Sequence, residues 1–295
     1  MAAGQHGVIS RRQAIEAGVT ARMIERRTGS GLWVAVHPGV YRLAGAPETW
    51  QQRLLGACLA TAGVASHRAA ARLWGLDLPS TERLVVTVMG TSRRSCRGAL
   101  LHHTRSLLGA DRAVREGIPC TSVARTLVDL AGEVGFDDLE ACVDSALRDN
   151  LATVRYLERW LPAQGKGGTA GLRELVDDRR RHRPFGSRRE ALVSRMLVAA
   201  GLPRPTAQHE LRDERGRFLA RFDLAWPDWR VAVEFASYRH HFGRRAWRSD
   251  TARANRATAH GWRVLTATDL DLGDACRSLA SGVGAARAGL SSVPA

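Results

Sequence analysis

The chain has 295 residues, of which 44% are hydrophobic and 25% are charged. These fractions lie near the averages of globular proteins, so they exclude a wholly disordered chain, and the length suggests two or three domains. Lysine and arginine together number 44 against 29 aspartates and glutamates, which gives a net charge of +15. This excess favours a polyanionic partner, although a GC-rich genome also enriches arginine.

Cysteine usage and apolar segments indicate the compartment. The five cysteines contain no Cys-x-x-Cys pair, which argues against a zinc ribbon or a disulfide framework. The opening residues MAAGQHGVISRR lack the apolar core of a signal peptide. The longest apolar run, residues 54–65, is too short to span a bilayer. We therefore expect a cytoplasmic protein with no membrane partner.

Composition and turn signals predict a multidomain α/β (α+β) protein with three domains. Residues 1–46 predict two short helices followed by two short strands. Residues 47–180 predict a mixed α/β segment that becomes wholly helical from residue 136. The segment RRRHRPFGS at 179–187 combines a charge run with Pro and Gly and predicts a linker. Residues 186–280 predict a sheet flanked by helices.

Individual elements of the last two domains follow from the same signals. In the middle domain we expect a buried helix over 54–65, a helix opening at Ser66, strands at 83–89 and 99–104, and a helix at 122–131. In the last domain we expect a helix at 188–200, strands within 208–236, a helix over about 245–260 and a strand at 262–267.

The first domain contains a helix, a glycine turn and a second helix. Ser10 is placed to cap a helix through RRQAIEA, and Gly18 stands where that helix should end. Thr20 is placed to cap the second helix, ARMIERR. This is the helix-turn-helix pattern, whose second helix lies in the major groove of duplex DNA. The apolar residues expected to join the two helices are Ala14, Ile15, Val19 and Ile24.

The second helix supplies the residues predicted to contact DNA. With the apolar residues turned inward, Arg22, Glu25 and Arg26 face away from the core. Thr20 and Arg27 belong to the same predicted contact set. Arginine side chains in such positions reach base edges and phosphates.

A hairpin follows, formed by LWVAVHPGVYRL with its turn at HPG. A hairpin directly after a helix-turn-helix is a wing, on which His37 and Arg42 are placed to touch phosphate. A protein-interaction module made of a helical hairpin and two strands is the alternative.

This domain resembles the winged helix at the start of AbiE-type (type IV toxin–antitoxin) antitoxins and related actinobacterial proteins. The resemblance rests on GVISRRQAIEAGV and HPGVYRL, and it extends through SHRAAARLWGL, VTV, GIPCTSVARTLVDLA and LEACVDSALR. It implies an autoregulatory DNA-binding head and a cognate toxin as a further partner. Within ARTLVDLA, helical spacing assigns the apolar residues to the core and predicts a surface pair between Arg125 and Asp129.

Two carboxylates face one another in the last domain if Asp228 and Trp229 form a two-residue hairpin loop. Paired positions then sum to 457, and Asp223 lies opposite Glu234. Opposed like charges destabilise a sheet, and bound Mg²⁺ is one reason to keep them.

Strand alternation assigns side chains to the two faces of this hairpin. One apolar face is expected to contain Phe222, Leu224, Trp226, Val231, Val233 and Phe235. The other is expected to carry the two carboxylates, with Ala225 and Ala232 leaving them accessible.

A third carboxylate, Glu190, lies in the preceding helix. The sequence SRRE at 187–190 is a capping box, so helix capping alone is one interpretation of Glu190 and a metal-binding or supporting role is the other, and the two are compatible. For the pair His240 and His241, an exposed polar turn is one interpretation, and the resemblance described next implies a general acid or base as the other.

Residues 186–275 resemble the PD-(D/E)XK nuclease core, and more closely the very-short-patch-repair-like domain that often follows an AbiE-type head. The resemblance implies Asp223 and Glu234 as Mg²⁺ ligands, Glu190 as an accessory acid, and a histidine from YRHH as acid or base. Where the family carries Glu-x-Asp-Gly or Glu-x-Lys, this chain has Ala236. Alanine supplies neither a ligand nor a water-orienting lysine, so we expect a degenerate site.

The sequence therefore favours a DNA-binding, antitoxin-like regulator with a weakened nuclease-like domain. An active Mg²⁺-dependent DNA endonuclease and a protein-interaction scaffold without a DNA role are the alternatives. The Gly-rich stretch GKGGTAG lacks the spacing of a phosphate-binding loop, so we expect no nucleotide cofactor.

Overall fold

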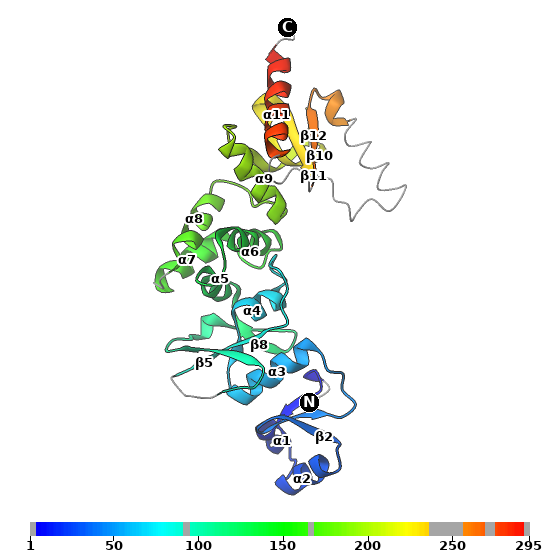
Figure 1. Ribbon diagram of the computed structural model, residues 1–295, viewed down its shortest axis with the longest axis vertical. Coiled ribbons are helices and arrows are strands. Elements are labelled where there is room, and N and C mark those ends of the chain that lie inside the picture. The colour runs from blue at the N-terminus through cyan, green and yellow to red at the C-terminus, as the bar shows by residue number, and fades with distance from the viewer. Residues whose placement is uncertain (1–3, 91–94, 165–167, 236–255, 269–274, 292–295) are drawn as a thin grey trace. The chain divides into compact units, whose positions relative to one another are not determined.

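A computed structural model of the protein describes residues 4–90, 95–164, 168–235, 256–268 and 275–291. These residues form three sheets with helices packed around them (Figure 1). The chain divides into two compact units. The first contains residues 1–142 and 150–173, and the second contains residues 143–149 and 174–295. The mixed α/β class predicted from the sequence is confirmed.

The N-terminal part of the first unit is a winged helix. Ser10 caps the first helix through a reciprocal capping box with Gln13, and Thr20 caps the second by accepting the N–H of Met23. Gly18 takes a left-handed φ of 84° in the turn between them. The elements are β1 (Val8–Ser10), α1 (Arg11–Glu16), α2 (Ala21–Gly29), β2 (Trp33–His37) and β3 (Val40–Leu43), with sheet order β1-β3-β2.

Two details of this head differ from expectation. Strand β1 was not predicted, and it pairs antiparallel with β3 to complete the sheet. The side chain of Ile15 is 50% exposed, so the inclusion of Ile15 in the core was wrong. The core is instead completed by Ile9 and Trp33, which pack with Ala14 and Ile24.

The middle of the first unit is a five-stranded sheet of order β6-β5-β4-β8-β7. The apolar run at 54–65 forms a helix only as far as Thr61, because Ala62 turns left-handed and Val64–Ala65 enter the sheet. Strands β7 and β8 were not predicted. The elements are α3 (Trp50–Thr61), β4 (Val64–Ala65), α4 (His67–Trp74), β5 (Leu84–Met89), β6 (Ala99–Thr104), η2 (Gly109–Asp111), β7 (Arg112–Arg115), β8 (Ile118–Thr121) and α5 (Val123–Ala131).

The helical character predicted for residues 136–180 is confirmed, but the break between Arg148 and Val154 was not predicted. Within the described residues this stretch contains three helices. They are α6 (Phe136–Arg148), α7 (Val154–Gln164) and α8 (Ala170–Arg179). Of these, α6 and α8 each supply residues to both compact units.

The second unit is built on a four-stranded sheet of order β12-β11-β10-β9, in which only the β11–β12 pair is parallel. Helices α9 and α11 share one apolar core with this sheet, through residues such as Val193, Leu197 and Val283. Helix α11 was not predicted. The elements are α9 (Arg188–Ala199), β9 (Thr206–Arg212), β10 (Phe218–Trp226), η3 (Pro227–Trp229), β11 (Val231–Phe235), β12 (Arg263–Ala267) and α11 (Ala275–Ser291).

The segment predicted as a linker, 179–187, is built into this second unit. Arg179 is buried and forms a bidentate ion pair with Asp144, with nitrogen–oxygen distances of 2.6 and 2.9 Å. Phe185 is buried in the same core as α9 and α11. A free linker exposes its side chains, so this stretch does not behave as one.

None of the helices in the described residues is long and apolar enough to cross a membrane.

Candidate nucleic-acid interface and carboxylate cluster

Helix α2 presents a basic face to solvent. Arg22, Glu25 and Arg26 are exposed, while Ile24 on the opposite side is buried in the head. Within the described part of the chain, Arg22 and Arg26 form no ion pair. Thr20 is also exposed, but its hydroxyl is engaged in capping the helix. Two arginines one turn apart are thus free to meet a polyanion.

The other residues predicted to contact DNA are engaged within the protein. The Arg27 guanidinium lies 5.0 Å from the ring centroid of Trp33, a cation–π contact that covers the head's core. Arg42 is paired with Glu48 at 2.6 Å and donates to the carbonyl of Ala46. These contacts hold both guanidinium groups against the head.

His37 is half-buried between the wing and helix α3. A ring nitrogen lies 3.6 Å from the sulfur of Cys96, and Gly56 of α3 packs against the ring. Burial lowers the pKa of His37, which favours the neutral form of the ring. A neutral, half-buried imidazole is a poor contact for phosphate.

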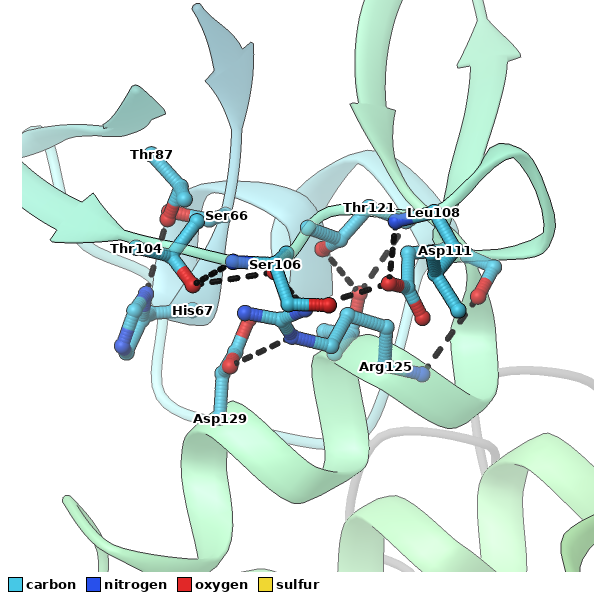
Figure 2. Close-up of polar contacts among 12 residues, drawn as sticks. Ser66, His67, Thr87, Thr104, Ser106, Leu108, Asp111, Thr121, Arg125 and Asp129 are labelled. Atoms are coloured by element: carbon cyan, nitrogen blue, oxygen red, sulfur yellow. Dashed lines mark hydrogen bonds and ion pairs between the residues drawn. The ribbon is translucent and has the colours of Figure 1, made fainter. Parts of the chain in front are cut away.

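The middle domain holds a buried ionic cluster around Arg125 (Figure 2). The Arg125 Nε donates to Asp129 at 2.9 Å, and Nη1 reaches Asp111 at 3.4 Å and the carbonyl of Ser106 at 3.2 Å. The Arg125–Asp129 pair was expected on the surface, but the two side chains are only 2% and 5% exposed. The helical spacing was right and the environment was wrong, because η2 and the residues after β6 cover this face of α5.

Beside this cluster, two histidine rings are stacked. His67 and His102 have ring centroids 3.9 Å apart, and His67 Nδ1 lies 3.0 Å from the hydroxyl of Ser66. That hydroxyl also accepts from Thr87 at 2.8 Å (Figure 2). Burial lowers the pKa of His67, although the charge of Asp129 acts in the opposite direction.

In the second unit, the predicted hairpin register is confirmed. Leu224 pairs with Val233, Ala225 with Ala232 and Trp226 with Val231, so each pair sums to 457. The loop differs from expectation. It is a four-residue connection, in which η3 (Pro227–Trp229) is followed by Arg230 in the left-handed conformation, rather than two residues at Asp228 and Trp229.

The predicted faces of the hairpin are partly wrong because strands β9 and β10 change face midway. Ala207, Leu224 and Trp226 belong to the core under α9 and α11. Leu211, Ala220 and Phe222 belong to a second core, although regular alternation would join them to the first. The change occurs at Gln208 and Asp223, and Gln208 adopts a left-handed φ of 50° there.

The second core also corrects the expected accessibility. Ala225 and Ala232 are fully buried and pack with Trp262. They therefore do not leave an open surface beside the carboxylates. Phe222, which was assigned to the face of Leu224, packs on Trp262 with ring centroids 4.9 Å apart.

Glu190 and Asp223 come together at the point where the strands change face. The side-chain amide of Gln208 donates to Glu190 Oε2 at 2.8 Å and to Asp223 Oδ1 at 3.3 Å. Glu190 also accepts from the backbone N–H of Gly186 at 2.7 Å and from the hydroxyl of Ser187 at 2.9 Å. Glu190 therefore supports the helix cap, and it also lies beside Asp223.

The electrostatics of this cluster follow from burial and like charge. Desolvation, followed by the nearby charge of Asp223, raises the pKa of Glu190 to about 7. The cluster borders a cavity of about 350 Å³ whose rim carries three arginines. Its lining residues are Arg148, Arg183, Pro184, Phe185, Gly186, Glu190, Gln208, Glu210, Arg221 and Asp223.

The remaining predicted site residues are only partly placed. Glu234 is half-buried on β11, where it pairs with Thr266 of β12. The backbone N–H of the next residue, Phe235, donates to Asp223 Oδ2 at 2.9 Å. Ala236, His240 and His241 lie outside the described residues.

The described residues do not fit a divalent cation as they stand. Each oxygen of Glu190 and Asp223 already accepts a hydrogen bond from a protein donor. No group of three acidic, histidine or cysteine side chains within the described residues is arranged to hold a metal. A cation bound between Glu190 and Asp223 would have to displace some of these donors.

The sequence does not predict that Gln208 and Gly186 belong to this cluster. Gln208 was treated only as part of a strand, since no pattern marks a left-handed glutamine. Gly186 was treated as a linker glycine, whereas a Cβ there would lie 2.6 Å from Gln208 Nε2. The sequence signal that could have placed Gly186 in the cluster is its position four residues before Glu190.

The fold of the head defines a class: a winged helix-turn-helix with an exposed arginine face on its second helix. Residues 1–44 match the family model described as "Transcriptional regulator, AbiEi antitoxin". The chain is also similar to two curated proteins from Mycobacterium tuberculosis strains CDC 1551 / Oshkosh and ATCC 25618 / H37Rv, each described as uncharacterized. The identity is 26% over 245 residues in both cases, which covers 81% of this chain and 83% of each relative.

Proposed function

We propose that the protein is a DNA-binding transcriptional regulator of the antitoxin type, and that helix α2 lies in the major groove of duplex DNA. The observation that carries this proposal is the exposed arginine face of α2, on a winged helix whose residues match the AbiEi antitoxin model. A net charge of +15 adds a general attraction to polyanions.

Some residues of this head hold helix α2 in place, and others are left exposed to contact DNA. Thr20 fixes the start of α2, and Arg27 fixes the helix against Trp33. Arg22 and Arg26 are left to reach DNA, one turn apart on the same face. Because His37 and Arg42 are engaged inside the protein, the proposal does not rest on them.

Binding of a duplex taken from the region upstream of the protein's own gene tests this proposal. We expect retardation of the duplex by the wild type and a loss of at least about tenfold in affinity in the double variant Arg22→Ala/Arg26→Ala, since two phosphate or base contacts disappear. Arg155→Ala/Arg159→Ala is the matched control, because these exposed arginines of α7 have the same spacing. No retardation by the wild type would favour the protein-interaction scaffold.

The antitoxin role calls for a cognate toxin and an intracellular site of action in the cytoplasm. A neighbouring gene for a nucleotidyltransferase-like protein would identify the candidate. Expression of that protein alone should arrest growth, and co-expression of this chain should relieve the arrest. If co-expression of this chain does not relieve the growth arrest, the antitoxin role is contradicted, whereas the proposal of DNA binding is unaffected.

We further propose that the second unit is nuclease-like in layout but does not cut DNA. Glu190 and Asp223 share a cavity with three arginines, which supports a nuclease-like layout, but their oxygens are occupied by protein donors. Incubation of plasmid DNA with Mg²⁺, Mn²⁺ or EDTA tests this. Cleavage that needs the metal and disappears in Asp223→Asn would establish the alternative, an active endonuclease.

A further inference from the structure

Gln208 occupies the position between Glu190 and Asp223 where like charges would otherwise face one another. A primary amide has two N–H donors, and here the Nε2 atom reaches one oxygen of each carboxylate. The backbone N–H groups of Gly186 and Phe235 and the hydroxyl of Ser187 complete the set of donors. A neutral group thus does the bridging that a cation does between paired carboxylates.

The backbone around Gln208 is arranged to hold the amide in this place. Its φ of 50° lies in the left-handed region, which is unfavourable for a residue that carries a Cβ. The Arg183 guanidinium donates to the Gln208 carbonyl at 3.2 Å, and this hydrogen bond stabilises the left-handed backbone conformation. Gly186 leaves the space that the amide fills, since a Cβ there would lie 2.6 Å from Nε2.

We propose that Gln208 is an amide plug: it holds Glu190 and Asp223 together without a metal ion and closes the pair to divalent cations. A cation entering the cluster must remove the amide first, and it must then compete with two backbone N–H groups for the same oxygens. This proposal is independent of DNA binding by the head.

Cation binding to the purified full-length protein tests the plug. Mn²⁺ is the probe, followed by electron paramagnetic resonance of the free ion and by calorimetry. The variant Gln208→Gly removes the amide and places at this position the residue that best tolerates a left-handed φ. We expect it to bind one Mn²⁺ at least about tenfold more tightly than the wild type does. Adding Asp223→Asn should abolish the gain.

Two further variants complete the design. Asn150→Gly replaces another left-handed residue (φ 56°) that lies outside the cavity, and it should bind Mn²⁺ like the wild type. Gln208→Asn tolerates the same backbone but withdraws the amide by one methylene, so it should share the gain of Gln208→Gly.

Two results would overturn the proposal. One is tight binding of Mn²⁺ by the wild type that is lost in Asp223→Asn, because the pair would then be open. The other is equal, weak binding by the wild type and both Gln208 variants, because the amide would then not be what closes the site.

Discussion

Arg125 and Asp129 form an ion pair across one turn of α5 in a place that water does not reach. The nitrogen–oxygen distance is 2.9 Å, and Asp111 approaches the same guanidinium from η2. Because Arg125 also donates to the Ser106 carbonyl, one side chain ties together a helix, a 3₁₀ turn and the loop after β6. Arg125 therefore stabilises the packing of three segments of the middle domain.

Removing this guanidinium should destabilise the protein strongly. Arg125→Met keeps the volume of the stem but removes the guanidinium from between the buried carboxylates of Asp111 and Asp129, a change that typically costs about 3–5 kcal/mol. The free energy of unfolding in urea measures the effect. Arg68→Met is the control, because the Arg68–Glu133 pair is partly exposed and should contribute about 1 kcal/mol or less. Equal losses in both variants would contradict this account.

Stability should also depend on the protonation of His67. Its pKa is lowered in the folded protein, mainly by burial, so the unfolded chain binds a proton more readily. The stabilisation is therefore complete above the unfolded pKa of about 6.5 and declines as the pH falls below it. Unfolding curves at several pH values should show this decline in the wild type and a shallower one in His67→Gln. His103→Gln, at an exposed histidine, should leave the decline unchanged.

Gly186→Ala should destabilise the second unit. The added Cβ would lie 2.6 Å from Gln208 Nε2 and 2.9–3.0 Å from both oxygens of Glu190. Overpacking of this kind typically costs about 1–3 kcal/mol. Gly284→Ala, whose Cβ meets open space on helix α11, should instead be neutral or stabilising. Thermal unfolding compares the two, and a stable Gly186→Ala protein would show that the cluster is not tightly packed.

The salt dependence of DNA binding should change with the arginines of α2. Affinity for duplex should fall steeply between about 50 and 200 mM salt, with a slope of about 0.9 per phosphate contacted. The double variant Arg22→Ala/Arg26→Ala should reduce that slope by up to about 2. Arg155→Ala/Arg159→Ala should leave it unchanged. A slope near zero in the wild type would contradict an electrostatic mode of binding.

Local signals in the sequence were enough for the elements that depend on them. Ser10, Thr20 and Ser187 were identified as helix caps from their spacing, and the register of β10 with β11 followed from turn position and alternation. The assignment of side chains to the two faces of the hairpin was wrong where the regular alternation of the strands is interrupted. The interruption occurs at Gln208, whose left-handed backbone conformation cannot be predicted from its residue type.

The burial of individual side chains could not be predicted either, because it depends on elements that are distant in sequence. The spacing of Arg125 and Asp129 predicted their pairing, but not the covering turn η2 that removes them from water. In the same way, Arg42 was identified by its place in the wing, while its partner Glu48 lies beyond the wing and carries no pattern. The exposure of Arg22 and Arg26 on α2 was predictable because an exposed helix face is a local property.

The two compact units are interleaved along the chain, which passes between them at 142/143, 149/150 and 173/174. No single cut of the polypeptide can therefore separate them. A fragment beginning at residue 186 would lack Phe185 from its core and Arg148 from the cavity rim. Limited proteolysis should accordingly release no autonomous fragment that starts there.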